Sequence, residues 1–165
     1  MARLKPQHIY TLGDYYATPD LQEDCHQIRK GNLVAVADAA YALAQKLPQN
    51  SILVPVPSRS GYAESLCEMM GYYARVPIAR PLSREDLRNG GVYLMKKGGK
   101  KVSESDTGIY RNESFFSPGR RVVLVDTVLA TGTSFSASAR ALGIPCEMAC
   151  VAVDYDTYNK YNNTK

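Results

Sequence analysis

The sequence has few of the residues that build metal sites and nucleophilic catalytic sets. Tryptophan is absent, histidine occurs only as His8 and His26, and none of the four cysteines forms a CxxC pair. A structural zinc site is therefore not expected, and no Ser-His-Asp or Cys-His set is readily built. We predict no metal-ligating residues and four reduced thiols, as in cytoplasmic proteins.

Long apolar segments are also missing. The first residues lack the apolar core of a signal peptide, and no uncharged apolar run approaches the roughly 18 residues of a membrane span. The longest apolar helical stretch, residues 33–47, contains Asp38, Gln45 and Lys46. We therefore expect a cytoplasmic protein that does not associate with membranes.

The residues that are present have the composition of an ordinary folded domain. Hydrophobic residues make up 45% and charged residues 22% of the 165 positions, which excludes a disordered chain. Without internal repeats or a domain boundary, the chain is predicted to form one domain over residues 1–165. A net charge of +4 favours anionic ligands but does not mark a dedicated nucleic-acid binder.

Apolar periodicity in the first half predicts helices and strands. Residues 20–47 are predicted to be helical, with the i, i+3, i+4, i+7 rhythm of one buried face in their second part. The β-branched run 51–57 shows no alternation, which is typical of a strand buried on both faces of a parallel sheet. A second helix is expected at 62–73 and a weaker strand at 76–80.

The second half repeats this alternation after an irregular stretch, residues 83–119. The best strand of the chain, 122–125, is expected to end in Asp126, and a helix at 135–142 and a strand at 146–153 follow. Strands that alternate with helices predict an α/β fold with a mainly parallel sheet flanked by helices, a Rossmann-type core.

The strongest chemical signal is the segment Val122-Val-Leu-Val-Asp-Thr-Val-Leu-Ala-Thr-Gly-Thr-Ser134. A buried strand places a carboxylate at its carboxyl end, where open parallel sheets bind their ligands. Hydroxyl residues and Gly132 follow just before a helix, and the N–H groups at a helix N-terminus attract phosphate. The segment therefore has the groups that a ribose 5-phosphate needs, although an ordinary turn and helix cap explain the same residues.

This thirteen-residue segment resembles the phosphoribosyl-pyrophosphate (PRPP) motif of type I phosphoribosyltransferases. The resemblance implies the fold of that family, with a long flexible loop beside the Rossmann-like core. It also implies that Asp126, a catalytic residue, and Thr127 bind the ribose hydroxyls. The phosphate would be bound by the next loop, which consists of Ala130, Thr131, Gly132, Thr133 and Ser134. Most members have two adjacent acids, whereas the second position here is Thr127, which raises the chance of a redirected site. Uracil phosphoribosyltransferases also lack the second acid, so PRPP binding is not excluded.

A second anion loop is expected after the first strand. Val54-Pro-Val-Pro57 is similar to the ComF-type members of the family, and the resemblance places a pyrophosphate loop directly after it. That loop would consist of Ser58, Arg59, Ser60 and Gly61. The alternative is a proline-rich turn with a solvated arginine. The arginine-rich stretch and the cysteine zinc module of ComF-type proteins are missing, so the likeness is firm for the fold and loose for the subfamily.

Three further regions have roles that only the resemblance implies. Residues 84–118 would form a flexible lid whose Arg84, Lys97 and Lys100 meet the leaving pyrophosphate, although a solvated basic hairpin is the simpler interpretation. Tyr155 and Tyr158 would help to form the base pocket, although residues 155–165 also read as a polar tail. Residues 7–25 would supply a small hood over the sheet.

These features favour a phosphoribosyltransferase. It would transfer ribose 5-phosphate from PRPP to a nucleobase or related nitrogen acceptor and release pyrophosphate, with Mg²⁺ bound through the substrate and with a homodimer as the family's usual assembly. The alternative is a non-catalytic module that binds PRPP or a nucleotide and regulates a partner or binds single-stranded nucleic acid. A kinase or dinucleotide-binding protein is disfavoured, because neither GxxxxGK[ST] nor GxGxxG occurs.

Overall fold

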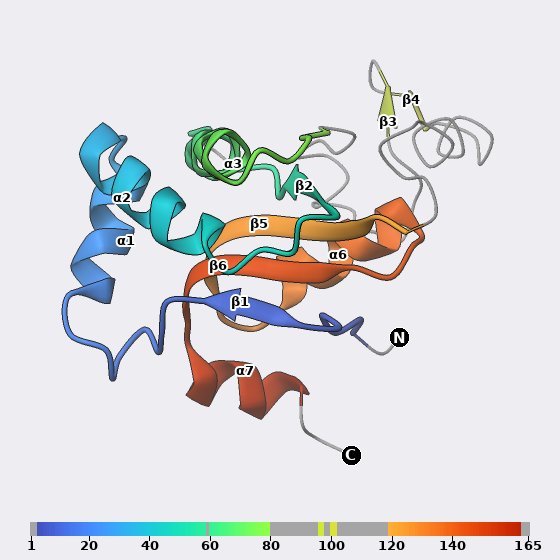
Figure 1. Cartoon of the computed structure of the whole chain (residues 1–165). Coiled ribbons are helices and arrows are strands. Elements are labelled where there is room, and N and C mark those ends of the chain that lie inside the picture. Colours follow the sequence, from blue (N-terminus) through green and yellow to red (C-terminus); the bar gives the residue numbers. More distant parts are fainter. Residues whose placement is uncertain (1–2, 59, 80–95, 98–99, 102–118, 163–165) are drawn as a thin grey trace.

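The centre of the molecule is a four-stranded sheet whose strands all run parallel. The computed structural model describes residues 3–58, 60–79, 96–97, 100–101 and 119–162. The sheet has the order β1-β6-β5-β2 (Figure 1). Its strands are β1 (Ile9–Thr11), β2 (Ser51–Pro55), β5 (Arg121–Leu129) and β6 (Glu147–Val153). The predicted α/β fold with a parallel sheet flanked by helices is therefore confirmed.

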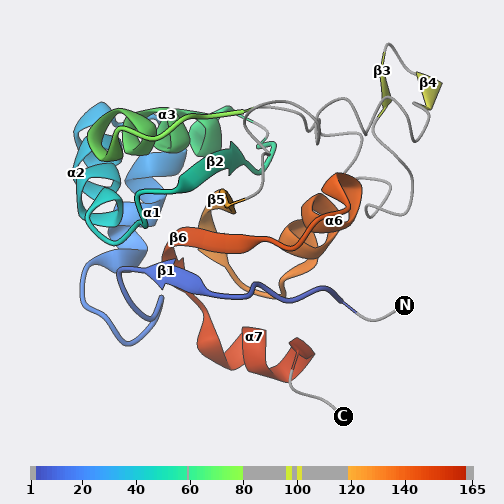
Figure 2. The same cartoon turned by 45° about the vertical axis from the view of Figure 1, so that its right-hand side comes forward.

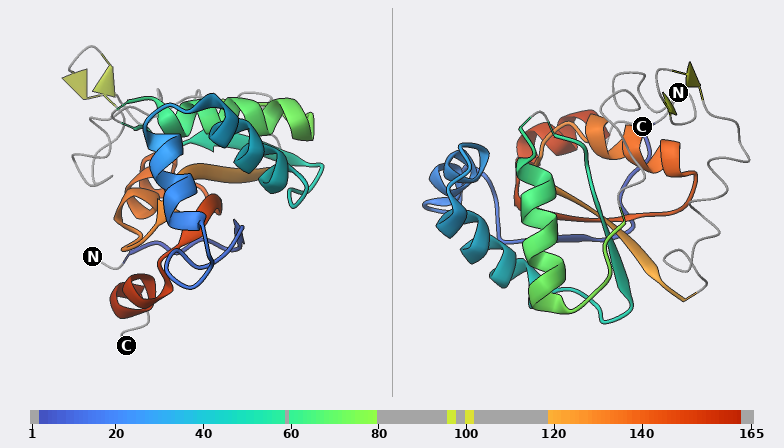
Figure 3. Two further views of the ribbon diagram at one scale, coloured as in Figure 1. Left: turned by 90° about the vertical axis from the view of Figure 1, so that its left-hand side faces the viewer. Right: turned by 90° about the horizontal axis from the view of Figure 1, so that it is seen from above.

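The central strands are apolar on both faces because helices cover both. Val123 and Val125 of β5 belong to one core cluster, and Val122 and Leu124 belong to the other. The first cluster is completed by α1 (Leu21–Arg29), α2 (Leu33–Ala44) and α3 (Tyr62–Ala74), and the second by α6 (Thr133–Leu142). Figures 2 and 3 show these helices in two layers with the sheet between them. This arrangement explains why the strands lack polar alternation.

The long helical region predicted at 20–47 is two helices. Asn32 separates them, because its side-chain oxygen accepts hydrogen bonds from the N–H groups of Val34 and Ala35 at 3.0 and 3.2 Å and so caps α2. The helix predicted at 62–73 is confirmed as α3, and the one predicted at 135–142 begins earlier, at Thr133.

Two predicted strands differ from the structure. The strand expected to end at Asp126 continues to Leu129, because β6 pairs with β5 as far as that residue. The weaker strand expected at 76–80 is reduced in the described residues to a single bridge between Ile78 and Leu53.

The sequence analysis predicted neither β1 nor the last helix, α7 (Tyr155–Asn162). Within 7–25, the segment predicted as a hood, β1 extends the sheet beside β6 and α1 begins. Most of the polar tail predicted at 155–165 is α7.

The predicted lid lies mostly outside the described residues. Its described part consists of β3 (Lys96–Lys97) and β4 (Lys100–Lys101), which pair antiparallel as a separate two-stranded sheet. Figure 1 draws this hairpin apart from the four-stranded sheet.

Candidate functional site

A small cavity opens where β5 passes into α6. Its volume is about 120 Å³. Its lining includes Asp126 and the whole predicted phosphate loop, together with four apolar residues: Val128, Leu129, Phe135 and Met148. The structure thus brings the predicted carboxylate and the predicted phosphate loop, residues 130–134, around one opening.

Gly132 sets the shape of this loop. It has a φ of +86° and is the N-cap of α6, and the N–H of Ser136 donates to its carbonyl at 2.9 Å. A Cβ at this position would lie 3.4 Å from the side-chain amide of Asn162 and 3.5 Å from the Tyr158 ring. These are ordinary van der Waals contacts, so it is the positive φ that favours glycine here. The loop therefore leads directly into a ten-residue helix whose N-terminus faces the same opening.

Two hydroxyl groups of the loop, those of Thr131 and Thr133, lie next to each other. Thr131 Oγ1 lies 3.0 Å from Thr133 Oγ1 and accepts a hydrogen bond from the Thr133 N–H at 3.3 Å. Both side chains remain exposed enough to be offered to a ligand, and both line the cavity. Hydroxyls beside a helix N-terminus are suitable donors for a phosphate group.

Helix α7 supports the phosphate loop from behind. The Asn162 side-chain amide is buried and donates at 2.8 Å to the carbonyls of both Thr131 and Tyr158. Asp154 caps the other end of α7, since its carboxylate accepts hydrogen bonds from the Thr157 N–H and hydroxyl at 3.1 and 2.7 Å. The sequence analysis missed both roles. An aspartate three residues before a threonine, directly after a strand, is the helix-start signal that would have found Asp154.

The two tyrosines predicted for the base pocket differ in their position along α7 and in their exposure. The Tyr158 ring packs beside Gly132, and burial raises the pKa of its hydroxyl. Tyr155, at the start of α7, is 38% exposed. Tyr158 is therefore adjacent to the phosphate loop at Gly132.

Asp126 is half-buried, and its surroundings disfavour the charged form of its carboxylate. Its Oδ1 accepts a hydrogen bond from the Thr127 N–H at 2.7 Å. Burial raises the pKa of Asp126 from 3.8 to about 6, although the Thr127 N–H and the charge of Arg29 lower it, while the charge of Glu64 raises it further. Arg29 lies on α1 and Glu64 on α3, so charges on two helices influence the titration of this carboxylate.

Thr127 points away from this cavity. Asp126, Val128 and Leu129 line the cavity, whereas Thr127 is not among the lining residues. It is fully buried, and its hydroxyl has no hydrogen-bond partner in the part of the chain that the structure describes. The structure therefore does not bring the Thr127 hydroxyl to the opening with Asp126.

The predicted pyrophosphate loop lies next to Asp126 at the same edge of the sheet. The Val56 N–H donates to the Val125 carbonyl at 2.9 Å, which holds the chain after β2 against β5. Ser58 is buried there, and Gly61 caps α3 with a φ of +77°. Ser60 lies exposed between them, and Arg59 lies outside the described residues.

The predicted lid residues are not placed at this site. Arg84 lies outside the described residues, and Lys97 and Lys100 are described only as a backbone pair of the β3–β4 hairpin. Their predicted catalytic roles remain predictions.

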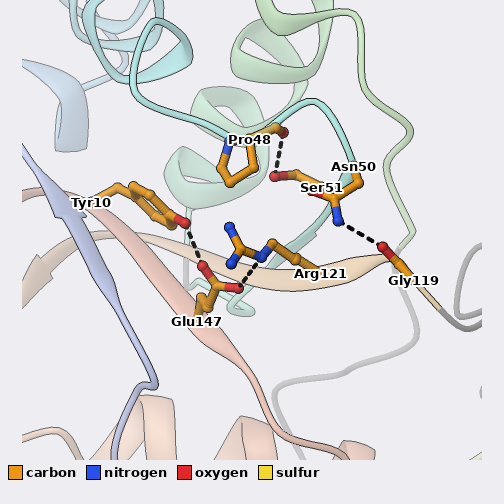
Figure 4. A network of polar contacts seen from close by, with 7 residues as sticks. All are labelled: Tyr10, Pro48, Asn50, Ser51, Gly119, Arg121 and Glu147. Atoms are coloured by element: carbon orange, nitrogen blue, oxygen red, sulfur yellow. Dashed lines mark hydrogen bonds and ion pairs between the residues drawn. The ribbon is translucent and has the colours of Figure 1, made fainter.

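A larger cavity, of about 780 Å³, lies at the opposite edge of the sheet, beside the amino ends of β5 and β6. There the Tyr10 hydroxyl donates to Glu147, whose other oxygen lies 3.4 Å from Arg121 Nε (Figure 4). The Asn50 side chain donates to the Gly119 carbonyl at 2.7 Å close by. Because these contacts link β1, β5, β6 and the start of β2, we interpret the network as structural.

Two kinds of feature are absent from the residues that the structure describes. No three His, Cys, Asp or Glu side chains there come together as ligands for a metal ion. No helix in the same residues is long and apolar enough to cross a membrane. Comparison of the sequence with models of known families finds no match, and comparison with curated proteins finds none either.

Proposed function

We propose that this protein is a phosphoribosyltransferase with the type I fold. It would transfer ribose 5-phosphate from PRPP to a nucleobase or related nitrogen acceptor and release pyrophosphate. One observation carries the proposal: Asp126 and the glycine-containing loop at the N-terminus of α6 line the same cavity. By the resemblance noted above, we also propose a cytoplasmic homodimer.

The cavity supports a division of the substrate between two loops. At about 120 Å³ it has room for one small group, such as the 5-phosphate, rather than for a whole nucleotide. The N–H groups at the start of α6, with Thr131 and Thr133, would donate to the phosphate oxygens. The Asp126 carboxylate would accept from the ribose hydroxyls, and the diphosphate would extend toward Ser58. Thr127, with its hydroxyl buried, has no part in this scheme.

The reaction would break the bond between C1 of the ribose and the pyrophosphate oxygen, which leaves with the electron pair. A nitrogen of the acceptor would form the new bond to C1 and lose its proton. Positive charge develops on the ribose, and the Asp126 carboxylate would stabilise it from close by. Arg84, Lys97 and Lys100 stay candidates for contacts with the leaving group, and Tyr155 and Tyr158 for contacts with the base.

The side chains around Asp126 fit the Mg²⁺ that PRPP brings with it. Mg²⁺ prefers oxygen ligands and usually keeps most of its contacts with substrate phosphates and water. Asp126 and Glu64 both supply carboxylate oxygens at this edge, so either would complete such a shell. When bound, Mg²⁺ neutralises charge on the diphosphate.

The proposal is tested by calorimetric titration with PRPP and Mg²⁺. Wild type should bind with micromolar affinity and Asp126→Asn at least tenfold more weakly, because the amide no longer offers two negatively charged acceptors. Asp38→Asn, an exposed change on α2, is the matched control and should bind like wild type. Nucleobases are then screened for pyrophosphate release. Equal PRPP affinity in wild type and Asp126→Asn, or no binding to either, would refute the proposal.

A second candidate is a module that binds PRPP or a nucleotide without turnover. Position 127 favours it, because a threonine stands there in place of a second acid and β5 presents only Asp126 to the opening. PRPP binding that depends on Asp126, without pyrophosphate release for any nucleobase, would support this candidate. Salt-dependent binding of single-stranded nucleic acid would identify its partner.

A further inference from the structure

The predicted pyrophosphate loop already holds an anion, and that anion is part of the protein. The Ser58 hydroxyl donates to Glu64 Oε1, and the Ser58 N–H lies 3.4 Å from Glu64 Oε2. The Ser58 oxygen in turn accepts a hydrogen bond from the Ala63 N–H at 3.2 Å. One carboxylate therefore uses both donors of the residue that the proposed function assigns to pyrophosphate.

The position of Glu64 in the fold explains this contact. Glu64 lies in the first turn of α3, and helix N-termini favour negative charge. The loop between β2 and α3 turns at Gly61, so the Glu64 side chain reaches back to Ser58 across it. A helix start after the carboxyl end of a parallel strand is where an anionic ligand would bind.

The charge of Glu64 also reaches the ribose site. The chain after β2 lies against β5 through the Val56–Val125 hydrogen bond, and the negative charge of Glu64 acts on Asp126. Two carboxylates thus come from separate elements to one edge of the sheet, and the charge of Arg29 also acts on Asp126 there. A free diphosphate that approached this edge would meet like charge as well as occupied donors.

We infer that Glu64 competes with pyrophosphate for the donors of Ser58. The Glu64 carboxylate must therefore leave Ser58 before the diphosphate can bind. The inference rests on the proposed function, since it assigns regulation of affinity to the same loop. Each incoming diphosphate oxygen replaces a carboxylate oxygen on the same donors, so few hydrogen bonds are gained. Glu64 would therefore weaken pyrophosphate binding and favour its release.

The test is titration of inorganic pyrophosphate, with EDTA present so that no metal bridges the anion to the carboxylates. Glu64→Gln keeps an oxygen acceptor for Ser58 but loses the charge, and it should bind pyrophosphate about tenfold more tightly than wild type. Glu68→Gln removes an exposed charge from the next turn of α3 and should leave the affinity within twofold of wild type. A helix-capping role alone predicts no gain in Glu64→Gln, so an unchanged or lower affinity overturns the inference.

A second variant keeps the test valid if Glu64→Gln does not fold. Glu64→Asp retains the charge but is one methylene shorter, so it holds Ser58 less well, and pyrophosphate affinity should rise severalfold. Unchanged affinity in this variant also overturns the inference. The proposed function is tested separately: it is refuted if PRPP binds wild type and Asp126→Asn with equal affinity. If Glu64→Gln binds pyrophosphate more tightly but PRPP binding does not depend on Asp126, the proposed function is rejected. The inference that Glu64 controls anion binding at this loop is then retained.

Discussion

At the scale of single residues, Asp126 and Thr127 show what a sequence motif does and does not determine. The motif identified Asp126 correctly as a side chain at the carboxyl edge of the sheet, beside the loop 130–134. By the resemblance it also assigned Thr127 to the ribose hydroxyls, and the strand was expected to end at Asp126. Because β5 continues to Leu129, Thr127 lies inside a central strand, where its side chain is fully buried.

The raised pKa of Asp126 predicts a stability that depends on pH. The pKa is about 6 in the fold and 3.8 ordinarily, so the folded state binds the proton more tightly than the unfolded chain. Stability should therefore fall as pH rises from about 4 to about 6 and stay level above that. Asp126→Asn, which cannot ionise, should be more stable than wild type at pH 7 by about 1–3 kcal/mol and equal to it near pH 4.

Urea unfolding at pH 4, 5, 6 and 7 measures this difference. The exposed Asp38→Asn should change stability by less than about 0.5 kcal/mol at every pH. A variant Asp126→Asn that is less stable than wild type at pH 7 would contradict the prediction. Because the same variant should lose PRPP, opposite effects on stability and binding would mark Asp126 as a residue kept for function.

At the scale of elements, the sequence analysis located most helices and strands but not those whose order depends on distant partners. The periodic residues of α2 and the apolar runs of β2, β5 and β6 are local signals, and they were sufficient. Strand β1 is three residues long and is held by β6, more than 130 positions away. Helix α7 has a polar, tyrosine- and asparagine-rich sequence, and the caps from Asp154 and Asn162 fix it in place.

Helix α7 should be as important to the site as the loop it supports. Asn162→Ala removes the hydrogen bonds to the Thr131 and Tyr158 carbonyls, and it should lower the free energy of unfolding by about 1–3 kcal/mol. The phosphate loop would lose its support, so PRPP affinity should fall at least threefold. Lys160→Ala, an exposed change on the same helix, should alter neither quantity measurably.

Calorimetry of PRPP binding and urea unfolding of the two α7 variants show whether Asn162 positions the phosphate loop or only stabilises the fold. If Asn162→Ala lowers stability but binds PRPP like wild type, then α7 does not position the loop.

At the scale of the whole molecule, the two edges of the sheet have separate tasks. The carboxyl edge gathers Asp126, Ser58 and the loop before α6, which could be predicted from the sequence because each lies near the carboxyl end of a strand. The amino edge gathers Tyr10, Arg121 and Glu147, which no motif links. The role of Glu64 at the carboxyl edge could not be predicted from the sequence either, because its contact with Ser58 depends on how the loop turns.

The amino edge should therefore control stability without affecting the site. Tyr10→Phe removes the hydroxyl that donates to the buried Glu147 carboxylate and leaves Arg121 as its ion-pair partner. An unfolding free energy lower by about 1–3 kcal/mol is expected, because a buried charge loses a donor. Wild type and variant should bind PRPP equally, since the network lies at the amino ends of β5 and β6 and Asp126 lies near the carboxyl end of β5.

The alkaline range gives a second readout of the same contact. Burial and the Glu147 carboxylate raise the pKa of Tyr10 to about 12, so the fold favours the neutral phenol. The stability that Tyr10 contributes should be complete below pH 10 and lost as pH rises toward 12, and Tyr10→Phe should lack this loss. A matching alkaline loss in the variant would assign it to other groups. A fall in PRPP affinity would show that the two edges are coupled through the sheet.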